Sequence, residues 1–258
     1  MIRRLILALT AFASLTTVAT AENLKEAVDQ YLVSAQSGPL DSPWTVTGNL
    51  GVTVTDGNSD TFTLTFGVEG VTKWDSWTLK LKLASIYAES NQVQSANEHI
   101  FIERLEKAFS DIESLFQELY LEHDDEEKLH FRIQITVGYK RRLIKKEKFE
   151  MWGEVGAGVL YEEFRATDDT EAILHLGVNW TWQLTKELLY TQIITFYPSL
   201  SNGGEFRMYW ESVFSTPIGD RLDLRLSIID KYDSDAPAGI KDNDIIVALS
   251  IAIKFTKE

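Results

Sequence analysis

The chain has 258 residues, of which 44% are hydrophobic, with 15 glycines and 5 prolines. This composition supports a folded core and excludes a collagen-like, low-complexity or wholly disordered chain. Acidic residues exceed basic ones by 39 to 25, and the resulting formal charge of −14 would repel nucleic acid. The absence of cysteine excludes disulfides, thiolate zinc sites and cysteine nucleophiles.

Residues 1–21 have the pattern of a cleavable secretory signal peptide. Two arginines precede the apolar run 5–18, which is shorter than the roughly 20 residues of a spanning helix. Small residues at 19–21 allow cleavage before Glu22. An uncleaved membrane anchor is the alternative. No later apolar stretch has the length of a spanning helix, so a mature chain that enters a membrane must cross it as strands.

Residues 22–43 show a different, helical pattern. Leu24, Ala27, Tyr31 and other apolar residues recur at three- and four-residue spacing, until glycine and proline residues end the stripe at 38–43. We therefore predict a short N-terminal helix, which forms a periplasmic arm over 22–43.

From residue 44 onward, apolar residues recur at every second position, which is typical of strands. Leu222, Leu224, Leu226 and Ile228, for example, alternate with polar residues. Glu103 and Lys107 lie in phase with apolar residues, so the number of strands stays open between 10 and 14. The candidate segments are 44–55, 61–73, 77–88, 98–109, 112–122, 128–140, 148–161, 171–183, 187–197, 205–215, 221–231 and 244–256.

The even count and the length of these segments favour a closed membrane barrel. We predict an all-β fold over 44–258, a transmembrane antiparallel up-and-down β-barrel of about 12 strands. Long outer and short inner connections are typical of the outer membrane of Gram-negative bacteria. The expected outer loops are 56–60, 89–97, 123–127, 162–170, 198–204 and 232–243; the inner turns are 74–76, 110–111, 184–186 and 216–220, with a longer basic turn at 141–147.

The two faces of the strands differ in polarity, but alternation alone does not say which face points inward. A soluble barrel would turn its apolar face inward; a membrane barrel turns it to the lipid and fills its lumen with polar groups. We expect luminal charges to pair, with Arg132, Arg207 and Arg225 set against acidic partners, here Glu118, Glu154, Glu211 and Asp223. The other polar-face residues are Lys80, Lys82, His175 and Lys254. Aromatics expected in interfacial girdles are Trp44, Trp74, Trp77, Trp152, Trp182, Phe196, Tyr197 and Phe255.

The segments 48–51, 56–61, 138–141, 153–158 and 161–163 form a pattern of glycine, polar and charged residues. This pattern resembles the YdiY-like family of salt-induced outer-membrane proteins of unknown function. The resemblance covers roughly 44–256, and it implies an outer-membrane barrel without supplying catalytic residues. Phe255 is followed by three further residues, whereas a terminal aromatic is usual in such barrels. The matching segments are Gly48-Asn49-Leu50-Gly51, Asp56-Gly57-Asn58-Ser59-Asp60-Thr61, Gly138-Tyr139-Lys140-Arg141, Gly153-Glu154-Val155-Gly156-Ala157-Gly158 and Tyr161-Glu162-Glu163.

The sequence offers weak signals for chemistry. His99 with Ser110 or Ser114 could form part of a hydrolase site, although no G-x-S-x-G elbow is present. The run His123-Asp124-Asp125-Glu126-Glu127 could bind a hard cation or form a solvated loop tip. The basic run 140–148 could bind anionic lipid or a periplasmic partner, or form a solvated turn. We assign no catalytic residue, metal site or cofactor.

The leading hypothesis is a non-enzymatic outer-membrane barrel, which serves as a structural envelope component or as a narrow path for small solutes or cations. Its expected partners are outer-membrane lipids, lipopolysaccharide and the barrel assembly machinery, and no nucleic acid. The alternatives are a barrel-embedded lipid hydrolase and a secreted soluble β-barrel that binds an apolar ligand.

Overall fold

A computed structural model describes residues 45–55, 61–90, 93–125, 128–164, 167–236 and 242–256. The predicted signal peptide at 1–21 and the predicted helical arm at 22–43 lie outside these residues. Within the described part, no helix has the length and hydropathy needed to cross a membrane.

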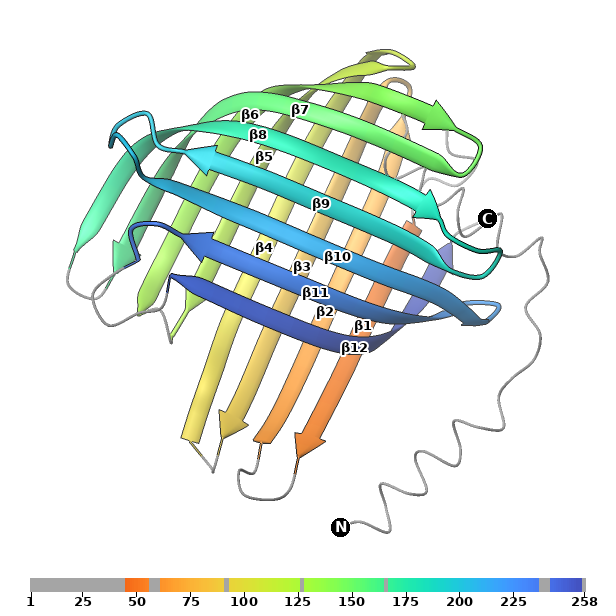
Figure 1. Ribbon diagram of the computed structural model, residues 1–258, viewed down its shortest axis with the longest axis horizontal. Helices are drawn as coiled ribbons and strands as arrows, with labels where there is room; N and C mark the ends of the chain where they lie inside the picture. The colour runs from red at the N-terminus through yellow and green to blue at the C-terminus, as the bar shows by residue number, and fades with distance from the viewer. Residues whose placement is uncertain are drawn as a thin grey trace.

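The described residues form twelve antiparallel strands that close into one barrel, in which β12 pairs with β1 (Figure 1). Each of the other pairings joins strands that are neighbours in the sequence, so the topology is up-and-down. The predicted all-β barrel and its strand number are therefore confirmed. The strands are β1 (Thr45–Thr55), β2 (Thr61–Trp74), β3 (Trp77–Ser90), β4 (Val93–Ser110), β5 (Glu113–Asp124), β6 (Leu129–Lys146), β7 (Phe149–Phe164), β8 (Asp168–Gln183), β9 (Leu189–Pro198), β10 (Phe206–Gly219), β11 (Leu222–Asp233) and β12 (Asn243–Thr256).

Several strands are longer than predicted, which shortens the connections between them. The predicted basic turn at 141–147 was wrong, because β6 continues to Lys146 and pairs with β7 there. The predicted loop at 89–97 was also wrong, because β3 continues to Ser90 and β4 begins at Val93. We call the end of the barrel with the connections 75–76, 111–112, 147–148, 184–188 and 220–221 the turn end, and the opposite end the loop end.

The apolar faces of the strands point outward. Ile135, Val159 and Leu249 are each more than half exposed, while Glu122, Arg132 and Lys140 on the inner face are almost fully buried. A soluble barrel would show the reverse arrangement. A surface of this kind is stable only against lipid, so the structure favours a membrane barrel and contradicts the alternative of a soluble barrel with an apolar interior.

The aromatic residues expected in the girdles divide between the two faces. Trp74, Trp182 and Phe255 are exposed on the outer face, as predicted. Trp152 and Tyr197 were placed wrongly: both are directed into the barrel, where Trp152 lies beneath Lys140 and Tyr197 lies against His175. Trp152 lies two positions before Glu154, so the alternation of a strand places both side chains on the inner face.

The poor alternation in β4 and β5 also has a structural explanation. Glu103 and Lys107 lie on the outer face, where each contacts a neighbouring strand. The Glu103 carboxylate accepts a hydrogen bond from Gln117 Nε2 at 3.2 Å, and Lys107 Nζ lies 4.9 Å from the centre of the Trp77 ring. These contacts partly compensate the cost of placing the two charges outside the barrel.

Candidate functional site: the charged lumen

The interior of the barrel holds a cavity of about 530 Å³ that all twelve strands line. Its lining reaches from Thr45 and Thr181 near the turn end to Glu98 and Asp244 near the loop end. Most of the charged lining residues form ion pairs with one another. Among the described residues, the lumen is therefore the candidate functional site.

A stack of three residues builds one wall of the lumen. Gly138 on β6 leaves space for the ring of Phe116 on β5, because a Cβ atom at Gly138 would lie 2.4 Å from Phe116 Cζ. The guanidinium of Arg104 on β4 lies over this ring, 4.0 Å from its centre. The glycine of the predicted family segment 138–141 thus supports the position of a luminal cation.

Arg104 is the centre of a carboxylate cluster. Its guanidinium lies 2.8 Å from Glu106, 2.9 Å from Glu118 and 2.9 Å from Glu154, each measured between nitrogen and oxygen. Glu106 also pairs with Lys80 at 3.0 Å and with Lys140 at 3.3 Å. Because these side chains are largely buried, every charge needs such compensation to be stable inside the barrel.

His175 belongs to the same wall. Its Nε2 atom lies 3.2 Å from a carboxylate oxygen of Glu154, and its ring is in contact with the rings of Phe116 and Tyr197. The imidazole is almost fully buried. It acts as a packed partner of the Glu154 carboxylate.

A second charge cluster lies nearer the loop end. Arg132 on β6 pairs with Glu122 on β5 and with Glu162 on β7. Arg207 on β10 extends this cluster, since its guanidinium donates to Gln134 at 3.1 Å and lies 3.5 Å from Glu162. The cluster therefore joins β5, β6, β7 and β10, and Arg132 also lies 3.8 Å from Asp233 on β11.

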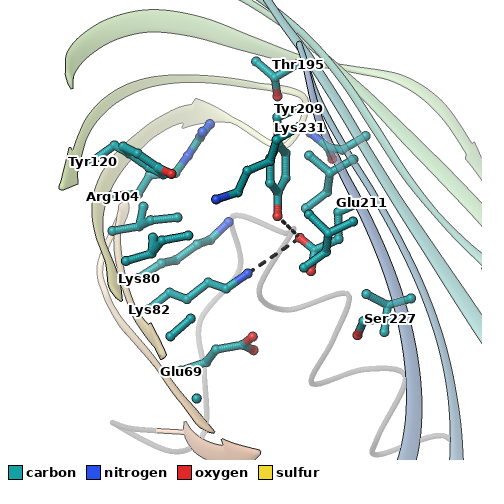
Figure 2. Close-up of a pocket in the computed structure, with 18 of the residues that line it drawn as sticks. Glu69, Lys80, Lys82, Arg104, Tyr120, Thr195, Tyr209, Glu211, Ser227 and Lys231 are labelled. Atoms are coloured by element: carbon teal, nitrogen blue, oxygen red, sulfur yellow. Dashed lines mark hydrogen bonds and ion pairs between the residues drawn. The ribbon is translucent and has the colours of Figure 1, made fainter. Parts of the chain in front are cut away.

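Ion pairs cross the lumen between opposite walls, and Lys231 takes part in two of them, with Glu98 on β4 and with Glu122. Lys231 on β11 pairs with Glu122 on β5, at an N–O distance of 2.7 Å, and these strands are diametrically opposite in the ring. Lys82 on β3 faces Glu211 on β10, with 3.6 Å between Nζ and Oε2 (Figure 2). A solute that passes along the axis must therefore move beside or between these bridges.

The prediction that luminal charges pair is confirmed, but the predicted partners were mostly wrong. Arg225 lies 3.8 Å from Glu69 on β2, and Glu118 and Glu154 pair with Arg104, which the sequence did not single out. The reason is geometric: alternation defines the face of each side chain, whereas the register and the curvature of the barrel decide which side chains meet. Luminal residues missed from the sequence are Arg104, Glu106, Glu122, Lys140, Glu162 and Lys231.

The structure does not bring the proposed hydrolase residues together. His99 lies on the outer face of β4, where its ring stacks on His123 with 6.1 Å between centres. Ser110 ends the same strand eleven residues away, a distance of about 36 Å along an extended chain. Ser114 on β5 is buried near the same turn end as Ser110. The hypothesis of a His99-based site is therefore wrong.

In the described part of the acidic run, His123, Asp124 and Asp125 do not share one face of the barrel wall. His123 Nε2 lies 3.5 Å from Asp125, while the side chain of the neighbouring Asp124 is on the opposite face of the strand and is buried. Asp125 also accepts a hydrogen bond from Asn97 at 2.6 Å. Within the described ranges, no group of three or more His, Asp or Glu residues is arranged to hold a metal ion. Glu126 and Glu127 lie outside the described residues.

Three solved barrels are similar to the chain. The translocator domain of the autotransporter NalP from Neisseria meningitidis is 9% identical, with a TM-score of 0.45, and the match covers 91% of this chain and 95% of that one. The KdgM porin is 7% identical, with a TM-score of 0.44, and the NanC porin is 9% identical, with a TM-score of 0.45; each match covers 83% of this chain and 99% of the other. Identities and scores this low carry no information about the role of the chain.

A comparison with curated proteins gave no match. The profile of a family described as proteins of unknown function, DUF481, matches residues 48–255. This range contains nearly all of the barrel, and the match is consistent with the resemblance to YdiY-like proteins. The chain therefore belongs to the DUF481 family.

Proposed function

We propose that the protein is a non-enzymatic β-barrel of the Gram-negative outer membrane that provides a narrow, passive path for small solutes and cations. The observation that supports this most directly is the luminal cavity, which all twelve strands line from one end of the barrel to the other. Its charged lining gives a passing solute polar contacts, while the bridges across the lumen restrict its size.

Export and assembly complete this proposal. The signal pattern at 1–21 would deliver the chain to the periplasm, and the barrel assembly machinery would insert it. The loop end would face outward, close to lipopolysaccharide, and the turn end would face the periplasm. The β6–β7 hairpin at the turn end carries the exposed basic residues Lys145, Lys146 and Lys148, which suit the anionic headgroups of the inner leaflet.

Electrical recording on planar bilayers tests the path directly. We expect small, ohmic conductance steps from the purified full chain, because ion pairs cross the lumen at two positions. Complete absence of conductance would contradict the proposal. Large, stable steps typical of an open channel would contradict the narrow path.

A structural role in the envelope is the second candidate. The Lys231–Glu122 contact joins opposite walls of the barrel, and such a contact between buried charges holds the two walls together. This role predicts that the protein is stable and abundant in the membrane without any solute flux. An absence of conductance would favour it over the path.

The acidic loop end predicts a preference for cations. The expected outer loops carry a large acidic excess, whereas the inner turns carry a small basic one. Carboxylates at the mouth concentrate cations within a Debye length of about 8 Å at physiological salt. Under a salt gradient, the reversal potential should therefore show cation selectivity, and neutralisation of four exposed loop-end residues should reduce it. These residues are Glu163, Asp168, Asp169 and Asp235.

Neutralisation at the opposite end provides the control. Asp111, Glu147 and Glu187 are exposed at the turn end, and changing them to their amides should leave most of the selectivity. An anion preference in the unmodified protein would contradict the proposal that carboxylates at the loop end cause cation selectivity. Equal effects of the two sets of changes would contradict it as well.

A further inference from the structure

The Lys82–Glu211 pair differs from the other luminal ion pairs in the access of its ammonium group to water. It joins opposite walls, since Lys82 lies on β3 and Glu211 on β10. The Lys82 side chain is 30% exposed, whereas the side chains of Arg104, Arg132 and Lys140 are 12% exposed or less. A solute in the lumen can therefore reach this ammonium group more easily than it can reach those cations.

The two halves of the pair are held differently. Tyr209 OH donates a hydrogen bond to Glu211 Oε2 at 2.8 Å, and this contact holds the carboxylate against the β10 wall. Lys82 reaches across the lumen from the facing wall, next to Lys80 (Figure 2). Its flexible four-carbon stem allows the ammonium group to swing aside, while the carboxylate stays in place. The bridge is therefore a contact that a solute can open.

The separation of charge across this bridge restricts which solutes can replace it. A simple cation at Glu211 would be repelled by Lys82, and a simple anion at Lys82 would be repelled by Glu211. A small zwitterion compensates both groups, because its carboxylate can contact Lys82 while its ammonium group contacts Glu211. Opposite charges on facing walls thus favour molecules that carry both charges.

We propose that Lys82 and Glu211 form the selecting constriction of the lumen, and that it favours small zwitterions of the amino-acid type over neutral solutes of the same size. This inference rests on the proposed path, and it adds the class of solute. It needs no change in the barrel wall, because only the Lys82 side chain has to move.

Osmotic swelling of proteoliposomes tests the selectivity. L-Serine serves as the zwitterion and erythritol as a neutral solute of similar size. We expect L-serine to enter about three to ten times faster than erythritol through the unmodified full chain, the range that one charge-paired contact gives. In Lys82→Met and in Glu211→Gln, both solutes should enter faster because the bridge is lost, and the ratio of the two rates should fall to about one.

Two further variants separate the charge effect from a general disturbance of the barrel. The exchange Lys82→Glu with Glu211→Lys keeps opposite charges on the facing walls, so it should restore the preference for L-serine. Lys186→Met removes an exposed lysine at the turn end, outside the lumen, and should leave the ratio unchanged.

The outcomes distinguish this inference from the proposed function. Swelling by the unmodified protein with a rate ratio of about one, or a ratio that persists in both single variants, would overturn the zwitterion preference and leave the path intact. An absence of swelling with either solute, together with an absence of conductance, would overturn the path and the inference with it.

Discussion

Leu226→Arg should strongly impair insertion of the barrel into lipid. Leu226 is exposed on the outer face of β11, where it is the fifth of twelve residues, and it pairs with Phe214 and Leu249 on the neighbouring strands. An arginine on the lipid face near the middle of the bilayer costs about 2–4 kcal/mol. Urea titration of the barrel folded into phosphatidylcholine vesicles would measure this loss as a change in the free energy of unfolding.

Substitutions on the same strand provide the controls. Ser227 is on the opposite face of the strand and lines the cavity. Ser227→Arg therefore places the same charge in a polar lumen and should lower the free energy of unfolding much less. Leu224→Arg lies on the lipid face nearer the turn end, and its effect should be intermediate, because the cost falls toward the interface. Equal losses for Leu226→Arg and Ser227→Arg would contradict the assignment of the outer face to lipid.

Arg104→Met should cause the largest loss of stability among the luminal variants. This substitution removes the guanidinium that contacts three carboxylates and leaves those acids without a major partner. Removal of one partner from a buried ion network costs about 3–5 kcal/mol. The free energy of unfolding in lipid vesicles should decrease by this amount.

Arg141→Met is the matched control, because it makes the same change at an exposed site. Arg141 lies 3.5 Å from Glu113, and its side chain is 55% exposed, so its loss should cost at most about 1 kcal/mol. If uncompensated charge causes the effect at Arg104, then adding Glu118→Gln and Glu154→Gln to Arg104→Met should recover part of the lost stability. A triple variant less stable than Arg104→Met would show that lost packing against Phe116, rather than charge, dominates.

The alternation of apolar residues allowed much of the barrel to be predicted. The segments 61–73, 77–88 and 244–256 match β2, β3 and β12 closely, because each residue on a strand faces the side opposite to its neighbour. The ends were predicted less well. β6 and β7 continue beyond the apolar run, and backbone hydrogen bonds between them hold polar residues such as Lys145 in the strand.

The candidate site was predicted only in outline. Lys82 and Glu211 were identified as polar-face residues, but nothing in the sequence indicates that they meet, since they are 129 positions apart. Arg104 lies in β4, where Glu103 and Lys107 obscured the alternation. Lys231 was the last residue of the predicted strand 221–231 and was not identified as luminal, whereas the structure places it inside the barrel.

The sequence by itself indicated about twelve antiparallel strands and determined the polar character of one face, because a strand repeats every two residues and needs no distant partner to do so. Only the tertiary structure decided which charges pair across the lumen. Contacts such as Lys231 with Glu122 depend on the stagger between neighbouring strands, on closure of β1 against β12 and on the resulting width of the barrel. Every pair of strands contributes to the total stagger and to the width of the barrel, so no single stretch of sequence determines them.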